Sequence, residues 1–288
     1  MSNKYMEWED PEVAKDMIAA IERLDKDVIT VLAGELSKDE ARYLVQSYYA
    51  QQDWRIAAAH RARELAKRGQ PSAILSYQTR QWRYLEAQIH RVLGVYAERF
   101  RVGRWSMSIC GIGPVITAGL IAHIDPHKAH TPSQTWKFAG LAPGQGRVAG
   151  KKLDYSPTLK QLAYHIGSCL IRFSNHPKQF YRDYYRARKE YETTRNEQLR
   201  YAEQAAKALK SKKWDTKKDA YAYLTKGMLP PGHIQARCRR WVAKLFLAHF
   251  TQAYRISEGL EVREPYAISY LGHKKVVSLP NPEVLAVE

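Results

Sequence analysis

A run of apolar side chains at helical spacing is the strongest constraint on the fold of this chain. Five side chains follow one another at intervals of three and four residues: Trp82, Leu85, Ile89, Val92 and Tyr96. In an α-helix they share one face, and the spacing predicts a long helix that Gly103 ends. Two heptads are too few to establish a coiled coil. The face therefore fits a contact with the core and the seam of a homodimer or larger assembly equally well.

Capping residues predict further helices on both sides of this one. Ser37 precedes Glu40 by three residues, which is the pattern of a capping box. Thr131 and Ser156 each precede a proline that fits the first helical position. A last amphipathic helix, IQARCRRWVAKLFLAHFTQAY, follows a Pro-Pro-Gly break. The segment DVITVLAG, residues 27–34, fits a short strand or a buried helical turn.

The charge of the chain is strongly positive and unevenly placed. The net charge is +17, yet residues 1–50 carry eleven acidic and six basic side chains. Residues 51–288 therefore carry a net charge of +22. Such a surface attracts polyanions and suits contact with a phosphate backbone. A surface charge kept for solubility is the alternative.

The segment CGIGPVITAGL, residues 110–120, combines a Gly-x-Gly-Pro turn with an apolar run that fits a helix. Gly111 and Gly113 allow positive φ and leave room for a phosphate near the backbone. Pro114 suits the first position of the following helix, whose N-terminal N–H groups favour an anion. Together with Ile112, these residues form a candidate hairpin that grips DNA backbone without reading sequence. A tight turn that leads into a buried helix is the alternative.

Basic side chains after this turn extend the candidate surface. The loop GLAPGQGRVAGKK, residues 140–152, is rich in glycine and basic. Between residues 172 and 218, fourteen Lys or Arg side chains stand against six Asp or Glu. Beyond the hairpin, we predict contacts with phosphate for these side chains: Arg147, Lys151, Lys152, Lys160, Arg182, Arg186, Arg188, Lys212 and Lys213.

Four segments in this order resemble the C-terminal domain of one family of insertion-sequence transposases: CGIGPVITAGLIAHI, WKFAGLAP, GRVAGKK and SPTLKQLAYHIG. That family, which includes the pilin-inversion recombinases, has a RuvC-like DEDD domain, a coiled coil and a helix-hairpin-helix transposase domain. The resembling core covers residues 109–173. The resemblance implies a role in DNA transposition or recombination.

Two departures from the family pattern concern catalysis. The family has a nucleophilic serine just before the loop glycine, and this chain has Ala149 there, which has no hydroxyl to attack a phosphate. Ser156 lies nearby but fits a helix cap better. The four acidic metal ligands of the family are not visible in the sequence, where Asp27 is the one look-alike. Two-metal chemistry needs several converging carboxylates, so we expect no strand-cleaving site in this chain.

These observations predict a mainly α protein, a helical bundle with a long connecting helix and a helix-hairpin-helix DNA-binding domain. We expect five parts along the chain: an N-terminal helical region (1–74), a long heptad-like helix (75–102), a transposase-like helix-hairpin-helix domain (103–175), a basic helical extension (176–260) and an extended tail (261–288).

Other residue types exclude some classes of site. His123, Asp125, His127 and His130 have no common metal-site spacing, so we expect a solvated loop and neither a metal nor a cofactor. The three cysteines lie far apart and favour a reducing compartment. The acidic N-terminus has no apolar core of a signal peptide, and no apolar run reaches the roughly 18 residues that span a membrane. We expect a cytoplasmic, nucleoid-associated protein with no membrane partner.

The sequence therefore favours a transposase-like DNA-binding protein that grips the phosphate backbone and does not cut it. Two other functions stay open. One is an active recombinase or nuclease that uses an unrecognised nucleophile or a partner subunit. The other is a structural or RNA-binding assembly protein in which the hairpin serves only for packing.

Overall fold

The structure is a computed structural model that describes residues 31, 33–146, 149–211, 213–263 and 277–286. All secondary structure in these residues is helical, with no strand among them, which confirms the predicted mainly α fold. The described part of residues 27–34 is helical too, which rules out a strand there. The chain forms two compact units, Met1–Arg104 with Gly113–His123 and Trp105–Ile112 with Ile124–Glu288. We call them the first and the second unit.

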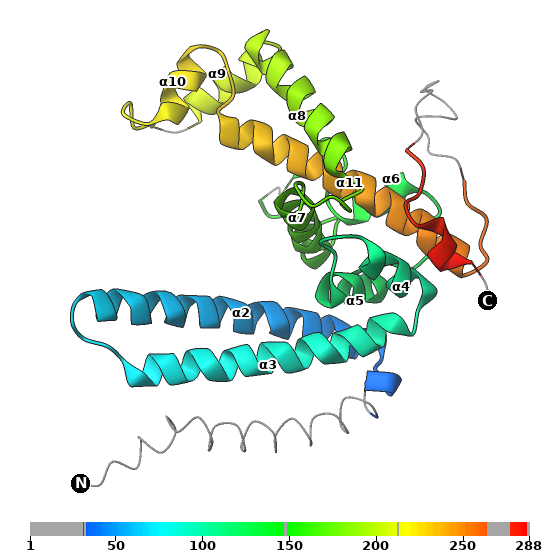
Figure 1. The fold of residues 1–288 in the computed structure, drawn as a ribbon. Coiled ribbons are helices and arrows are strands. Elements are labelled where there is room, and N and C mark those ends of the chain that lie inside the picture. Colours follow the sequence, from blue (N-terminus) through cyan, green and yellow to red (C-terminus); the bar gives the residue numbers. More distant parts are fainter. Residues whose placement is uncertain (1–30, 32, 147–148, 212, 264–276, 287–288) are drawn as a thin grey trace, which may run out of the picture. The chain divides into compact units, whose positions relative to one another are not determined.

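The first unit is built on two long antiparallel helices, α2 (Lys38–Lys67) and α3 (Ala73–Glu98) (Figure 1). The predicted capping box is present, since the Glu40 backbone N–H donates to Ser37 Oγ and the Ser37 N–H donates to Glu40. Gly69, two residues after the end of α2, has a φ of +74°, where L side chains are strained. The apolar helix α5 (Pro114–His123) packs against both long helices.

The buried stripe of α3 differs from the predicted one. The structure buries Glu86, Leu93, Tyr96 and Ala97, whereas Leu85 is 45% exposed. The reason is the partner helix: α2 supplies Arg55, whose Nε donates to Glu86 Oε1 at 2.5 Å and so makes a charged residue acceptable on the buried face. The predicted apolar seam is therefore only partly used inside the first unit.

The sequence predicts that Gly103 ends the long helix, and this prediction is wrong. The helix ends at Glu98, and the chain enters α4 (Arg101–Ser108), which contains Gly103. A Cβ atom on Gly103 would lie 1.9 Å from the carbonyl oxygen of Ala97. The glycine therefore permits the chain to pass close to the C-terminal end of α3.

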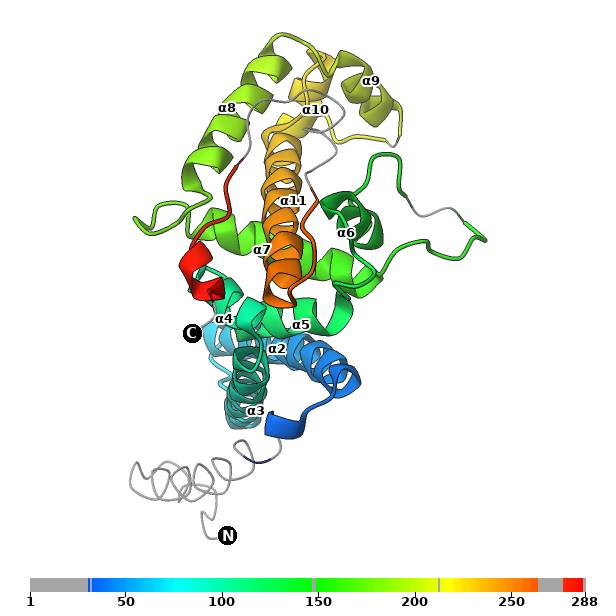
Figure 2. The same ribbon diagram turned by 90° about the vertical axis from the view of Figure 1, so that its right-hand side faces the viewer.

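The second unit is arranged around α11 (Pro231–Ser257), which contacts α6 (Pro132–Phe138), α7 (Pro157–Arg172) and α8 (Arg182–Glu197) (Figure 2). Aromatic side chains fill its core: the ring of Trp105 stacks on Phe246 with centroids 6.1 Å apart. Trp105 Nε1 also donates to the carbonyl oxygen of Pro280 at 2.7 Å. The short 3-10 helix η2 (Pro282–Leu285) packs on α11, so the described end of the predicted extended tail is partly folded.

The basic stretch after Arg182 is broken into separate helices rather than one long one. α8 is followed by α9 (Ala202–Lys210) and α10 (Asp219–Thr225). Leu199 adopts a φ of 56° between α8 and α9. The Asn196 side chain then fixes the return of the chain, because it donates to the Leu229 carbonyl at 2.9 Å and accepts from the Leu229 N–H at 2.8 Å.

Candidate nucleic-acid interface

The Gly-x-Gly-Pro turn lies where the chain passes from the second unit to the first. Gly111 has a φ of +90°, and a Cβ there would lie 3.0 Å from the ring of Phe173. Gln179 Nε2 holds the turn by donating to the Cys110 carbonyl at 2.6 Å. Packing alone thus accounts for Gly111, and the side chain of Ile112 is 4% exposed. The phosphate role of this turn stays a prediction.

The two residues that follow belong to the first unit. Among the described residues, no atom lies within 4 Å of a Cβ built on Gly113, so that position has open space there. Pro114 is the first residue of α5, as expected for a proline at the start of a helix. The carbonyl of Gly113 accepts from the Thr117 N–H at 3.1 Å, which begins the helical hydrogen bonding.

The Gly-rich loop of the second unit is closed at its base. The Ser156 N–H donates to the Phe138 carbonyl at 2.8 Å, so the segment between them is a loop with joined ends. A Cβ on Gly140 would lie 2.7 Å from the ring of Tyr155, which explains the glycine at the loop's start. Gln145 Nε2 crosses the loop to Asp154 Oδ2 at 3.2 Å.

This closed loop presents two lysines to solvent. Lys151 and Lys152 are both exposed and follow Gly150, which has a φ of +74°. Ala149 is exposed beside them. Arg147, which we also predicted to contact phosphate, lies outside the described residues. Two exposed ammonium groups on an anchored, glycine-rich loop can reach a phosphate backbone without rearranging the fold.

The structure gives Ser156 a local role. Its Oγ accepts from the Leu159 N–H at 3.2 Å, and it is the N-cap of α7. Pro157 follows as the first helical residue. The predicted cap is confirmed, and capping accounts for the serine without a catalytic role.

Lys160 of α7 and Arg239 of α11 each lie over a tyrosine ring. Lys160 Nζ is 4.3 Å from the ring centroid of Tyr155. On the same helix, Tyr164 carries the guanidinium of Arg239, from α11, 4.2 Å from its centroid. We predicted a contact for Lys160 alone. The positions of Tyr164 and Arg239, 75 residues apart, depend on how α7 and α11 pack, which no local pattern reveals.

The three predicted arginines of α8 differ in their surroundings. Arg182 Nε lies 3.2 Å from the exposed carboxylate of Asp183. Arg186 is exposed, and its Nη2 donates to Asn175 Oδ1 at 3.2 Å. Arg188 instead donates to Glu192, whose side chain is fully buried. Its charge is therefore largely compensated within the protein. Of the two predicted lysines that follow, Lys213 is exposed and Lys212 lies outside the described residues.

Glu192 gathers three donors around one buried carboxylate. Tyr201 OH donates to Oε2 at 2.5 Å and Arg237 Nε donates to the same oxygen at 2.7 Å, while Arg188 bonds the other. Burial raises the pKa of Glu192, but the hydrogen bonds of Arg237 and Tyr201 and the positive charges outweigh it and hold the pKa below its ordinary value. This ion cluster ties α8 and α11 to the start of α9.

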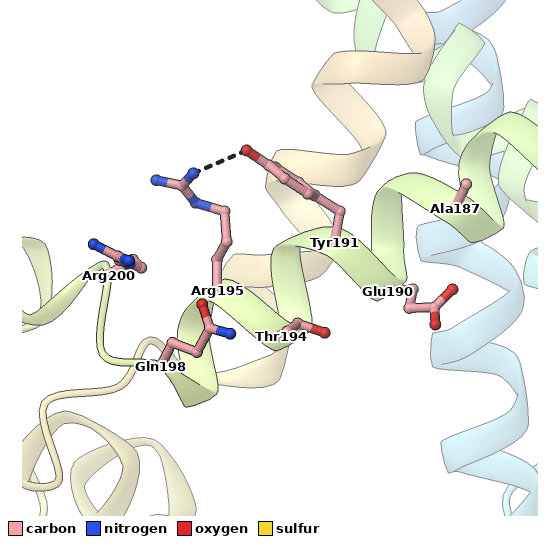
Figure 3. A pocket seen from close by; sticks show the side chains of 7 residues that line it. All are labelled: Ala187, Glu190, Tyr191, Thr194, Arg195, Gln198 and Arg200. Atoms are coloured by element: carbon pink, nitrogen blue, oxygen red, sulfur yellow. Dashed lines mark hydrogen bonds between the residues drawn. The ribbon is translucent and has the colours of Figure 1, made fainter.

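An open depression along the C-terminal half of α8 carries a second group of aromatic and basic side chains (Figure 3). Arg195 Nη1 donates to the Tyr191 hydroxyl at 2.9 Å, and the guanidinium lies 5.4 Å from the same ring. Arg200 and the carboxylate of Glu190 also line it. A depression that contains a carboxylate and is open to solvent is a poorer anion site than the loop.

The candidate metal residues do not form a site in the described residues, which hold no group of three or more His, Cys, Asp or Glu placed to bind an ion. Asp125 Oδ1 accepts from the His127 backbone N–H at 3.0 Å, which is a local turn contact. Asp27 lies outside the described residues. Nor does any described helix have the length and apolar character to cross a membrane.

Comparison with known proteins agrees with the resemblance seen in the sequence. No curated protein and no solved structure matches the chain. A family model does match: residues 105–182 fit the Transposase IS116/IS110/IS902 family. The matched residues run from Trp105 through the Gly-x-Gly-Pro turn, the closed loop and α7, and they include no DEDD domain. Over residues 105–182, the chain is thus similar to the Transposase IS116/IS110/IS902 family.

Proposed function

We propose that this chain binds DNA through the phosphate backbone and takes part in transposition or recombination without a strand-cleaving site of its own. The observation that carries the proposal is the position of exposed positive charge inside the segment that matches the transposase family. Lys151 and Lys152 project from the closed loop of that segment. From Asp154 to Asp183 no acidic residue intervenes in the sequence, whereas four Lys or Arg side chains do.

The surface fits duplex backbone because its contacts are ionic and independent of sequence. Lysine on a flexible stem is a point charge that suits phosphate without reading base edges. We expect Arg182 and Arg186 of α8 to add to the surface, whereas Arg188 is occupied by Glu192. The Gly111–Pro114 hairpin remains part of the proposal on the strength of the sequence pattern.

The absence of cleavage rests on chemistry at two positions. Ala149 offers no oxygen nucleophile where the family has serine, and Ser156 uses its Oγ to cap α7. Covalent transfer of a DNA strand needs an activated nucleophile in reach of the phosphate. Neither position supplies one.

Two assays test this function. Fluorescence anisotropy with a 30-base-pair duplex should show binding whose affinity falls linearly with the logarithm of salt concentration. Incubation with supercoiled plasmid and Mg²⁺ should leave the plasmid intact. Strand breaks that Ser156→Ala abolishes would establish the active-recombinase alternative, and tighter binding of structured RNA than of duplex DNA would establish the RNA-binding one.

We also propose a homodimer formed through α3. Leu85 is 45% exposed, and Ile74, which lies eleven residues or about three helical turns before it, is 64% exposed. Ile89 and Val92 remain partly exposed on the same side. A second copy of this helix would cover the apolar stripe that α2 leaves open.

A further inference from the structure

The two central helices of the second unit carry positive charge without any acidic residue. α7 and α11 together hold seven Lys or Arg side chains and no Asp or Glu. Arg237 pairs with Glu192, and Arg255 donates to the Pro126 and Glu261 carbonyls. Lys244 lies over the ring of Trp136, and burial lowers its pKa.

The other four basic side chains of α7 and α11 form no ion pair within the described residues. They are Lys160, Arg172, Arg239 and Arg240, and none has a carboxylate at ion-pair distance in the described part of the chain. Like charges on packed helices repel one another. An external polyanion is the partner that would relieve this repulsion.

Arg239 is only partly exposed and lies over an aromatic ring. Its guanidinium lies 4.2 Å from the ring centroid of Tyr164. Gly167, one turn further along α7, makes this possible: a Cβ there would lie 2.6 Å from Arg239 Cγ and 2.6 Å from the Arg239 carbonyl oxygen. The glycine lets α11 approach α7 so closely that the arginine can lie across it.

Tyr164 nevertheless keeps most of its surface open. The side chain is 54% exposed, although it is large and aromatic and lies in the middle of a helix. Lys160 is one turn before it, on the same face, and lies over Tyr155. The surface thus presents a largely exposed aromatic ring, with one guanidinium 4.2 Å from the ring centroid and a lysine one helical turn away.

We propose that Tyr164, Arg239 and Lys160 form a site for an unpaired nucleobase of single-stranded or locally opened DNA. The base stacks on the open part of the Tyr164 ring, and the neighbouring phosphates contact Arg239 and Lys160. Aromatic rings set among cations bind single strands in this manner, because every base has a π face. In a closed duplex the bases are stacked on one another, so none is available to stack on the Tyr164 ring. The inference rests on the proposed function, since both require binding to DNA.

The test compares a single-stranded oligothymidylate with a duplex of equal length, using the full chain and fluorescence anisotropy. Tyr164→Ala should weaken binding of the single strand by about 10-fold, the order of one lost stacking contact, and leave duplex binding unchanged. Tyr164→Phe keeps the ring and should bind the single strand like the wild type. Exposed helix positions accept alanine readily, and far-UV circular dichroism verifies folding of both variants.

A second readout reports contact with the base directly. A single strand that contains 5-iodouracil should crosslink on irradiation to the peptide that carries Tyr164, as mass spectrometry detects. An unchanged affinity of Tyr164→Ala together with no crosslink at that peptide would overturn the site, as would an equal loss of duplex binding. So would tighter binding of a matching RNA strand, because the proposal assigns the base to DNA.

The outcomes separate this inference from the function on which it rests. If Lys151→Ala/Lys152→Ala weakens duplex binding while Tyr164→Ala changes nothing, the proposed function stands and the base site is wrong. If the wild-type chain binds neither duplex nor single strand, both are wrong.

Discussion

Replacing Glu192 with glutamine should destabilise the second unit, because the carboxylate is buried and three side chains donate to it. It accepts from Tyr201 OH at 2.5 Å, from Arg237 Nε at 2.7 Å and from Arg188. Glutamine keeps the shape but removes the charge, and its amide NH₂ replaces an accepting oxygen. One guanidinium would then face a donor.

The expected loss is about 3 kcal/mol of unfolding free energy at pH 7. Breaking a buried ion pair by removing one partner costs about 3–5 kcal/mol, because the remaining charge is left without compensation. The low end applies here, since the side chains of Arg188 and Arg237 are 28% and 23% exposed and can regain water. Glutamine also keeps one acceptor oxygen.

The effect should depend on pH with a defined sign. The pKa of Glu192 is held below its ordinary value of 4.5, so folding favours the ionised form. The stability that the carboxylate contributes is complete above the unfolded pKa and is lost as the pH falls through the lower folded pKa. The difference between the wild type and Glu192→Gln should therefore be largest near neutrality and shrink in acid.

Urea unfolding followed by far-UV circular dichroism at pH 7 and at stepwise lower pH measures this difference. Glu190→Gln is the matched control, because Glu190 is an exposed carboxylate two residues away on the same helix. A loss below about 1 kcal/mol for Glu192→Gln, or a loss that stays constant on acidification, would refute the reasoning.

Substitutions at three further positions have defined outcomes. Gly167→Ala should lower the unfolding free energy by about 1–3 kcal/mol, because a Cβ there would lie 2.6 Å from Arg239. Thermal unfolding measures this loss against Gln161→Ala, a variant at an exposed position of the same helix. Equal melting temperatures of the two variants would contradict the close approach of α7 and α11. Ser156→Ala should lower the unfolding free energy by about 1 kcal/mol through loss of the α7 cap, whereas Ser156→Asp should retain most of the stability that the cap contributes. Equal stability of the two variants would contradict the capping role. Leu85→Glu should convert the dimer to a monomer, as light scattering measures, whereas Ala87→Glu, at an exposed position of the same helix, should leave the dimer intact. A monomeric wild type would exclude the α3 dimer.

Local capping chemistry explains why three of the helix starts could be predicted from the sequence. The Ser37–Glu40 box, the Thr131–Pro132 pair and Ser156 each act within one helical turn, and helices begin after all three. Such contacts depend on residues three or four apart. Tertiary packing does not need to be known to find them.

The failures of the sequence analysis share a tertiary cause. Glu86 is buried on α3 because Arg55 arrives from α2, and this pairing shifted the buried stripe away from the predicted apolar seam. Gly103 marks a close return of the chain rather than a helix end. Each depends on a partner brought in from outside the local pattern.

The candidate site was only partly visible for the same reason. Lys151 and Lys152 follow a glycine-rich segment, so their exposure could be expected. In the sequence, Arg188 looks like the neighbouring arginines, yet in the structure it forms an ion pair with Glu192, one helical turn further along α8. The Arg239–Tyr164 contact joins two helices and becomes apparent only once α7 and α11 are packed.

The salt dependence of duplex binding tests the central claim most directly. The wild type and Lys151→Ala/Lys152→Ala are titrated with one duplex between 50 and 200 mM salt, and Lys38→Ala/Lys226→Ala removes the same charge from exposed positions elsewhere as the control. Loss of two phosphate contacts should make the slope of log affinity against log salt shallower by about 2, whereas the control should keep the wild-type slope. Identical slopes for the wild type and the loop variant would contradict backbone binding through this loop.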